Sequence, residues 1–245
     1  MPELQSRPQH ELLLGRALLS VFRDWRQTVE KLGTIDWGQF AGEAAAAAMP
    51  ILKSVYLEAG ASLAAQRQAD VAGMEAAAQQ WATDQAALLA GQIAAMTQAR
   101  VEMLRQRASD EEDRSLVAAA LILLMGGDRA FRIGVTEVTR AVTAGERAAL
   151  EQVRQQAAQL QAEAEQATVA GREADAEGKL IAAGLLQAAA ELVTVWVTAR
   201  DEAVCPVCSP LHGVEEAFWP PELGDGPPAH VNCRCWLDNV PKSGR

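Results

Sequence analysis

Two stretches near the C-terminus decide the fold: WVTARDEAVCPVCSPLHG at residues 196–213 and PPAHVNCRCWLDNV at residues 227–240. Together they hold all four cysteines of the 245-residue chain and two of its three histidines. Residues 192–198, LVTVWVT, alternate and are rich in β-branched side chains, which is typical of a short strand. A second strand at residues 233–237 is its predicted antiparallel partner. The segment between them is rich in proline and glycine, and we expect a long, irregular loop there.

Upstream of residue 192 the chain is rich in alanine, glutamine and glutamate, and its apolar residues recur at helical spacing. We expect helical segments at residues 9–31, 41–49, 51–107, 109–125, from 128 onward, 146–171 and 173–191. Asp36, Ser109 and Asp128 are the predicted helix caps. Pro50 is predicted either to stop the alanine run or to lie in the first turn of the next helix.

Two apolar patterns predict how these helices pack. The first is interpreted as the core face of a helical bundle and consists of Trp81, Leu88, Leu89, Ile93, Met96, Val101 and Leu104. The second is one face of the helix that follows Asp128 and consists of Phe131, Val135, Val138 and Val142, with Thr136, Glu137, Thr139 and Arg140 on the other sides. Residues 146–171 are polar almost all round, which favours a solvated or partner-bound helix.

The predicted fold class is therefore mainly α with a small C-terminal β unit (α+β). We expect an extended helical bundle followed by a short antiparallel sheet that a Cys/His-rich loop clasps. The predicted regions are a helical N-terminal region at 1–107, a helical middle region at 108–191 and a Cys-rich β clasp at 192–245.

Composition restricts the class of partner. The net charge is −10 and the chain has no basic run, which argues against a protein that coats DNA and favours protein partners. The longest apolar run, residues 116–125, is about half the length needed to cross a bilayer. The N-terminus lacks a signal-peptide pattern, and the few cysteines suit a cytosolic product with reduced thiols.

The cysteines have the spacing of a metal site. Cys205 and Cys208 form a CxxC turn that lets two thiolates converge on one metal ion. Cys233 and Cys235 are two residues apart, so on a strand their side chains would share a face. We predict a structural zinc ion bound by these four cysteines, or a Cys3His site in which His230 replaces Cys233 or Cys235.

Other interpretations of the cysteine motif remain open. One or two disulfides would close the same loop, and the thiols would also suit a buried, unligated role as small apolar side chains. A thioredoxin-like redox site lacks the βαβ setting that it needs. His212 is a weaker metal-ligand candidate. A catalytic zinc would need an open position and a general base, for which the loop offers Glu215 and Glu216. We therefore expect no catalytic residues and no enzyme.

The C-terminal stretch resembles the signature of the phage head morphogenesis proteins, the phage Mu F-like minor head proteins. The residues that carry the resemblance are Asp201, Cys205, Pro206, Cys208, Leu211, Gly213, Pro227, Pro228, His230, Asn232, Cys233, Arg234 and Cys235. A weaker likeness lies upstream, in a helix that carries Thr136, Glu137, Arg140, Ala141 and Gly145. The resemblance covers about residues 80–240.

This resemblance implies a low-copy structural protein in the head of a tailed phage. Such a protein is made in the host cytoplasm, assembles with the portal during procapsid formation and stays in the virion head near the portal and DNA. The implied partners are the portal protein and the major capsid or scaffolding protein, with local contact to packaged DNA, no membrane and several copies in the virion. The alternatives are a metal-dependent nuclease or toxin-like effector carried in the virion, and a small zinc-ribbon DNA-binding module.

Overall fold

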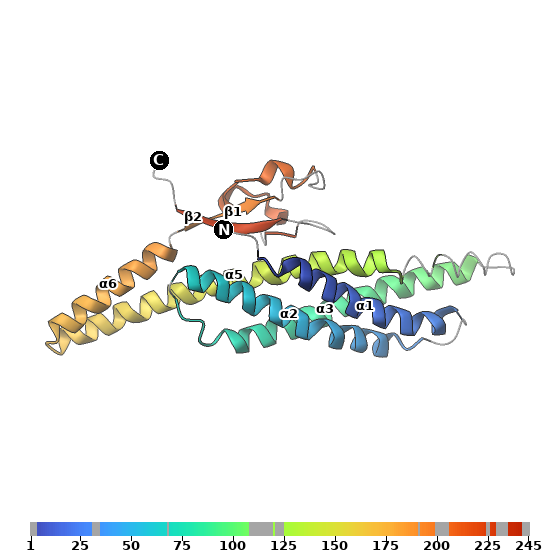
Figure 1. The fold of residues 1–245 in the computed structure, drawn as a ribbon, viewed down its shortest axis with the longest axis horizontal. Helices are drawn as coiled ribbons and strands as arrows, with labels where there is room; N and C mark the ends of the chain where they lie inside the picture. The colour runs from blue at the N-terminus through green and yellow to red at the C-terminus, as the bar shows by residue number, and fades with distance from the viewer. Residues whose placement is uncertain are drawn as a thin grey trace.

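The structure, a computed structural model, describes residues 4–30, 35–67, 69–107, 120, 125–190, 192–198, 206–223, 226–228 and 235–241. Within these residues the fold is mainly helical with one two-stranded antiparallel sheet, as predicted. The helices are α1 (Arg7–Glu30), α2 (Trp37–Gln66), α3 (Met74–Arg107), α5 (Gly127–Val169) and α6 (Glu173–Ala190). The strands are β1 (Leu192–Val197) and β2 (Trp236–Pro241). Figure 1 shows an elongated helical bundle with the sheet lying against one side of it.

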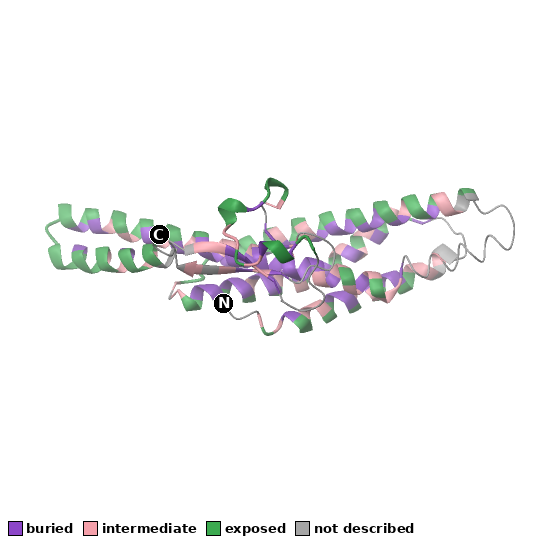
Figure 2. Ribbon diagram, turned by 90° about the horizontal axis from the view of Figure 1, so that it is seen from above, coloured by how far each residue is buried: buried purple, intermediate pink, exposed green. Residues whose placement is uncertain are grey.

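Helices α1, α2 and α3 pack around the first half of α5 and share one apolar core. The second half of α5 projects beyond the bundle and pairs with α6, which folds back along it (Figure 1). We call this projection, residues 157–190, the arm. Much of the outer surface of the arm is exposed, whereas the bundle side of α5 is buried (Figure 2). None of the helices in the described part of the chain is both long and apolar enough to span a membrane.

Glycines let α5 approach its neighbours closely. A Cβ atom at Gly145 would overlap the carbonyl oxygen of Tyr56 in α2, and one at Gly134 would lie 2.7 Å from the carbonyl oxygen of Glu11 in α1. On the facing helix, a Cβ atom at Gly60 would lie 3.0 Å from the carbonyl oxygen of Gly145. The two crossings therefore bring backbone against backbone, which only a residue without a side chain permits.

The predicted helix boundaries are partly right. Asp36 caps α2 as predicted, because its side chain accepts a hydrogen bond from the backbone N–H of Gln39 at 2.9 Å. Pro50 neither stops a helix nor opens one: it lies inside α2. Burial of Ala48, Leu52 and Val55 around it offsets the roughly 3 kcal/mol that a proline costs within a helix. Before α5 the N-cap is Gly126, and Asp128 is an acidic residue in the first turn instead.

The core face predicted for residues 81–104 is wrong at two positions. Leu89, Ile93 and Val101 are buried, but Leu88 and Met96 are 56% and 67% exposed. The missing core positions are taken by small residues at helical spacing: Ala78, Ala82, Ala86, Ala90 and Ala94. The helix predicted from Ser109 to residue 125 lies almost wholly outside the described residues.

The C-terminal strands lie near their predicted places. β1 matches the prediction, and β2 pairs with it antiparallel, with Leu192 opposite Pro241 and Val197 opposite Trp236. The predicted second strand at 233–237 is displaced, because β2 begins at Trp236 and Cys235 precedes it. The prediction that Cys235 shares a strand face with a second cysteine is therefore wrong, because Cys235 lies outside β2. The loop between the strands carries three short 3-10 helices, Ser209–Leu211, Glu216–Phe218 and Pro221–Leu223.

Candidate functional site

The sheet and its loop form a small body with its own apolar core. We call this body the β unit; its described residues are 192–198, 206–223, 226–228 and 235–241. The buried residues of its core are Trp196, Cys208, Leu211, Trp219, Cys235 and Leu237. The rings of Trp196 and Trp219 meet edge to face with centroids 5.2 Å apart, and the Trp219 indole N–H donates to the carbonyl oxygen of Val214 at 2.9 Å. The described part of the loop thus packs around two tryptophans.

The same core brings together the two halves of the cysteine motif. Cys208, from the CxxC turn, is 1% exposed, and Cys235, from the second half, is 2% exposed. Both carry thiol groups in the structure. Cys205, His230 and Cys233 lie outside the described residues. Within the described ranges there is no cluster of three or more His, Cys, Asp or Glu side chains that could hold a metal ion. The zinc site therefore stays a prediction.

His212 has a structural contact. Its Nδ1 accepts a hydrogen bond from the backbone N–H of Thr198 at 3.1 Å, and the Thr198 hydroxyl lies 3.1 Å from the same nitrogen. In a neutral ring that accepts at Nδ1, the proton is on Nε2. The ring therefore holds the loop to the end of β1, and Nδ1 is not available as a metal ligand in this arrangement.

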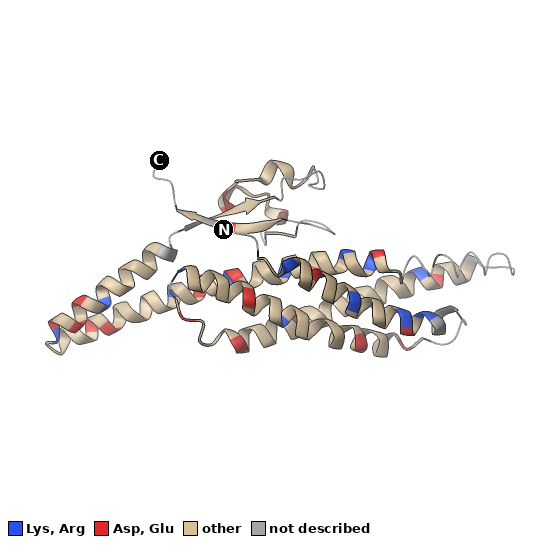
Figure 3. Ribbon diagram, viewed as in Figure 1, with Lys and Arg blue, Asp and Glu red and all other residues tan. Residues whose placement is uncertain are grey.

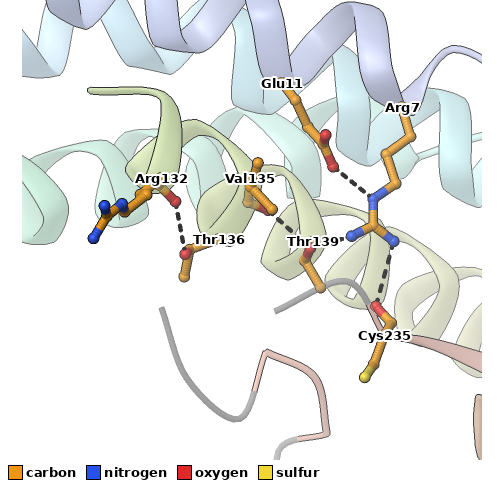
Figure 4. Close-up of polar contacts among 7 residues, drawn as sticks. All are labelled: Arg7, Glu11, Arg132, Val135, Thr136, Thr139 and Cys235. Carbon is orange, nitrogen blue, oxygen red and sulfur yellow. Dashed lines mark hydrogen bonds and ion pairs between the residues drawn. The ribbon is translucent and has the colours of Figure 1, made fainter. Parts of the chain in front are cut away.

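The β unit rests on one side of α5, which we call the seat. Arg7, at the start of α1, is 1% exposed and connects three elements (Figure 4). Its guanidinium donates to Glu11 at 2.8 Å, to the Thr139 hydroxyl at 2.7 Å and to the backbone carbonyl of Cys235 at 3.4 Å. Thr139 in turn donates to the carbonyl oxygen of Val135 at 2.8 Å. One buried arginine thus connects α1, α5 and the residue before β2.

Three more α5 residues complete the seat. The Thr143 hydroxyl donates to the carbonyl oxygen of Pro227 at 3.0 Å, and Arg147 forms an ion pair with Glu216 at 2.9 Å. Glu146 lies between them in sequence and is 9% exposed. Thr139, Thr143, Glu146 and Arg147 follow the i, i+4, i+7, i+8 pattern, so they lie on one face of the helix. That face is covered by the β unit.

Glu146 is a buried acid in unusual surroundings. Burial, and next the negative charge of Asp238 in β2, raise its pKa to about 8, while the amino terminus and Arg7 act in the opposite direction. Its Oε2 atom is buried and accepts no hydrogen bond from the described part of the chain. Burial lowers the pKa of Arg67 at the end of α2, and the negative charge of Asp238 acts in the opposite direction. Glu146 is therefore mostly protonated at pH 7.

The upstream motif residues hold helices together. The Thr136 hydroxyl donates to the carbonyl oxygen of Arg132 at 2.9 Å, as Figure 4 shows. Glu137 is 5% exposed and bonds to Gln85 of α3 at 2.8 Å and to Arg140 at 2.5 Å. Ala141 is fully buried, and Gly145 is the close crossing with α2. Each of these motif residues therefore serves the packing of α5.

A serine, a histidine and a glutamate also meet at the start of α1. The Ser6 hydroxyl lies 2.5 Å from one carboxylate oxygen of Glu58, and His10 Nε2 lies 2.8 Å from the other. Burial raises the pKa of Glu58, but the hydrogen bonds from Ser6 and His10 and the charge of His10 outweigh it, so that the pKa is lowered. In a hydrolytic relay the histidine lies between serine and acid. Here the acid lies between the other two, so the arrangement tethers α1 to α2.

The seat was not predicted from the sequence. Thr139 was assigned to a side of the helix away from the core, and Arg7, Thr143, Glu146 and Arg147 were not singled out. Thr139, Thr143 and Glu146 are polar residues at helical spacing, and such a pattern by itself predicts a solvent-exposed face. The signal that was present is the repeat of β-branched, weakly helix-forming threonines on one side of α5.

Fold and seat together define a class: a mainly helical protein in which a short C-terminal motif builds a small sheet and joins it to a long helix. Residues 135–238 match the family model of phage Mu protein F-like proteins, so this segment of the chain is similar to that family. The family is one of phage head morphogenesis proteins, so the resemblance drawn from the cysteine motif is confirmed. A search of curated proteins and a search of solved structures each found no match.

Proposed function

We propose that the protein is a minor head protein of a tailed phage. It acts as a low-copy structural component that assembles with the portal during procapsid formation and remains in the virion head near the portal and DNA. The observation that supports this most is the phage Mu protein F-like match, which runs from α5 into β2 and so contains the seat, the arm and the β unit. The singled-out motif residues of α5 serve packing, which favours a structural role over catalysis.

The arm supplies a surface for a protein partner. Residues 180–190, the C-terminal part of α6, contain no charged side chain, and Figure 3 shows the charges of the arm towards its tip. Leu180, Ile181 and Leu185 are 53%, 59% and 68% exposed on this part of the helix. Apolar side chains grouped on a projecting helix favour contact with another protein. We assign this contact to the portal protein, with the major capsid or scaffolding protein as a second neighbour.

Co-purification tests the assembly role. We expect the protein to co-purify with portal protein from procapsids and virions, and Leu185→Glu to weaken that association at least tenfold. Val169→Glu is the matched control, because Val169 is an exposed apolar residue of the same arm at the end of α5. Absence of the protein from both procapsids and virions would overturn the proposal. Turnover of nucleic acid that is lost on His212→Ala would favour the nuclease instead.

We also propose a structural zinc ion in the β unit. Its ligands are Cys205, Cys208, Cys233 and Cys235, with His230 as the alternative to one of the last pair. The support is that Cys208 and Cys235, one from each half of the motif, are buried in the same small core. The ion would hold the loop closed and would supply no catalytic chemistry. Elemental analysis of the purified protein should find one zinc per chain; absence of zinc together with four titratable thiols would overturn this proposal.

A further inference from the structure

The β unit and the helical bundle are joined by polar contacts. Their apolar cores share no residue within the described part of the chain. Among the described contacts of this joint are the hydrogen bonds of Arg7 and Thr143 to backbone carbonyls of the β unit and the ion pair of Arg147 with Glu216. Polar junctions of this kind separate more readily than an apolar core. The docking of the β unit is therefore sensitive to any change of charge at the seat.

Glu146 is the group at the seat that can change charge. Its position on the helix, three residues after Thr143 and one before Arg147, places it under the β unit, and its Oε2 atom is buried without a hydrogen-bond partner in the described residues. The charged groups that act on it are Asp238 from β2, Arg7 from α1 and the amino terminus, and Arg67 of α2 in turn acts on Asp238. A buried carboxylate with an unsatisfied oxygen beside a second acid is costly, whereas the protonated acid costs much less because it carries no charge.

We propose that the β unit docks most strongly on α5 while Glu146 is protonated, and that loss of this proton weakens the docking and favours release of the β unit from the helical bundle. In the released state water hydrates the carboxylate, and the distance from Asp238 removes the repulsion. The proton leaves to solvent, so no other reactant is needed. The switch follows from the seat alone and does not depend on the proposed role in the phage head.

Proton linkage sets the size and the pH range of the effect. Docking raises the pKa of Glu146 from its ordinary 4.5 to about 8, so the docked state holds a proton that the released state gives up. Docking is therefore strongest below about pH 4.5 and weakens as pH rises, by up to about tenfold per pH unit, until about pH 8. Above about pH 8 the docking constant no longer changes with pH, because Glu146 is ionised in both the docked and the released state.

Reaction of Arg7 with phenylglyoxal measures release, because Arg7 is buried beneath the β unit and is exposed when the unit leaves. The full-length protein is treated at pH 6.5, 7.25 and 8, and modification is measured by mass spectrometry. Arg16, an exposed residue of the same helix, corrects for the pH dependence of the reagent. We expect the ratio of the Arg7 rate to the Arg16 rate to rise at least tenfold across this range in the wild-type protein.

Three variants decide the cause. Glu146→Gln keeps the size and shape of the side chain but cannot ionise. In this variant the ratio of the Arg7 rate to the Arg16 rate should be low and independent of pH. Glu137→Gln is the matched control, because Glu137 is also a buried glutamate of α5 but has hydrogen bonds from Gln85 and Arg140. It should follow the wild type. Asp238→Asn removes the opposing charge and should reduce the pH dependence without abolishing it. A flat wild-type ratio, or a Glu146→Gln ratio that rises like the wild type, would overturn the proposal.

Discussion

The crossing of α5 over α2 at Gly145 gives the sharpest prediction for stability. In Gly145→Ala the new Cβ atom would overlap the carbonyl oxygen of Tyr56 and lie 2.9 Å from its carbonyl carbon. Carbon atoms in contact are normally about 3.5–4.0 Å apart, so the contact with the carbonyl carbon alone would require the two helices to separate by at least about 0.6–1 Å. Neither contact atom is a flexible side chain, and therefore the backbone itself must move.

The expected change in the free energy of unfolding of Gly145→Ala is the difference of two opposing effects. Replacement of glycine by alanine inside a helix stabilises by about 1 kcal/mol. Overpacking of a close contact costs about 1–3 kcal/mol, and we expect the upper part of that range, about 2–3 kcal/mol, because the contact atoms are backbone and the contact at Gly60 on the facing helix is loosened as well. We expect a net loss of about 1–2 kcal/mol in the free energy of unfolding, and a larger loss for Gly145→Val.

Urea unfolding followed by far-ultraviolet circular dichroism measures this difference. The matched control is Gly91→Ala in α3, because a Cβ atom there meets nothing within 4 Å. That variant should be more stable than the wild type by about 0.5–1 kcal/mol, through helix propensity alone. If Gly145→Ala proves as stable as Gly91→Ala, the close crossing is not a determinant of the fold.

Three further changes test the joint, the core and a cap by the same unfolding measurement. Arg7→Met removes the three hydrogen bonds of the buried guanidinium and should destabilise by about 3 kcal/mol; a loss below 0.5 kcal/mol would contradict its role at the seat. Leu89→Ala should cost about 3 kcal/mol and its exposed neighbour Leu88→Ala less than about 0.5 kcal/mol, and equal effects would contradict the assigned face of α3. Asp36→Ala should cost about 1 kcal/mol through loss of the cap on α2, and an unchanged urea midpoint would show that the cap adds nothing.

The sequence predicts elements well where local pattern decides them. The alternation at residues 192–198 gave β1, and Asp36 before an alanine-rich segment gave the start of α2. The prediction from sequence fails where packing against a neighbouring helix decides the structure. Pro50 looks like a helix end, but the buried residues around it keep α2 continuous. Leu88 and Met96 look like core, but both are exposed, and the buried side of α3 includes alanines at four-residue spacing that the pattern of large apolar residues does not report.

The seat is harder still, because its contacts join distant parts of the chain. Arg7 and Cys235 are separated by 228 residues, and Thr143 and Pro227 by 84. No periodicity within one segment reports such a pair. The cysteine motif did predict that Cys208 and Cys235 approach each other, because a loop rich in proline and glycine needs a closing contact. It did not predict that the β unit would be held to α5 by hydroxyl groups and one arginine.

The neighbours of α5 explain why its motif consists mostly of small and polar residues. The family match begins at Val135, inside α5, and so leaves out α1, α2 and α3. Yet Val138 and Val142 are buried in the core that those three helices share with α5, and Gly145 lies against the backbone of α2. The next residue, Glu146, faces the β unit. Between residues 136 and 146 the helix thus has neighbours on nearly every side, which excludes large side chains and requires a hydrogen bond for each polar one. Glu137 meets that requirement and Glu146 does not, and this difference between two buried glutamates on one helix is why we place the switch at Glu146.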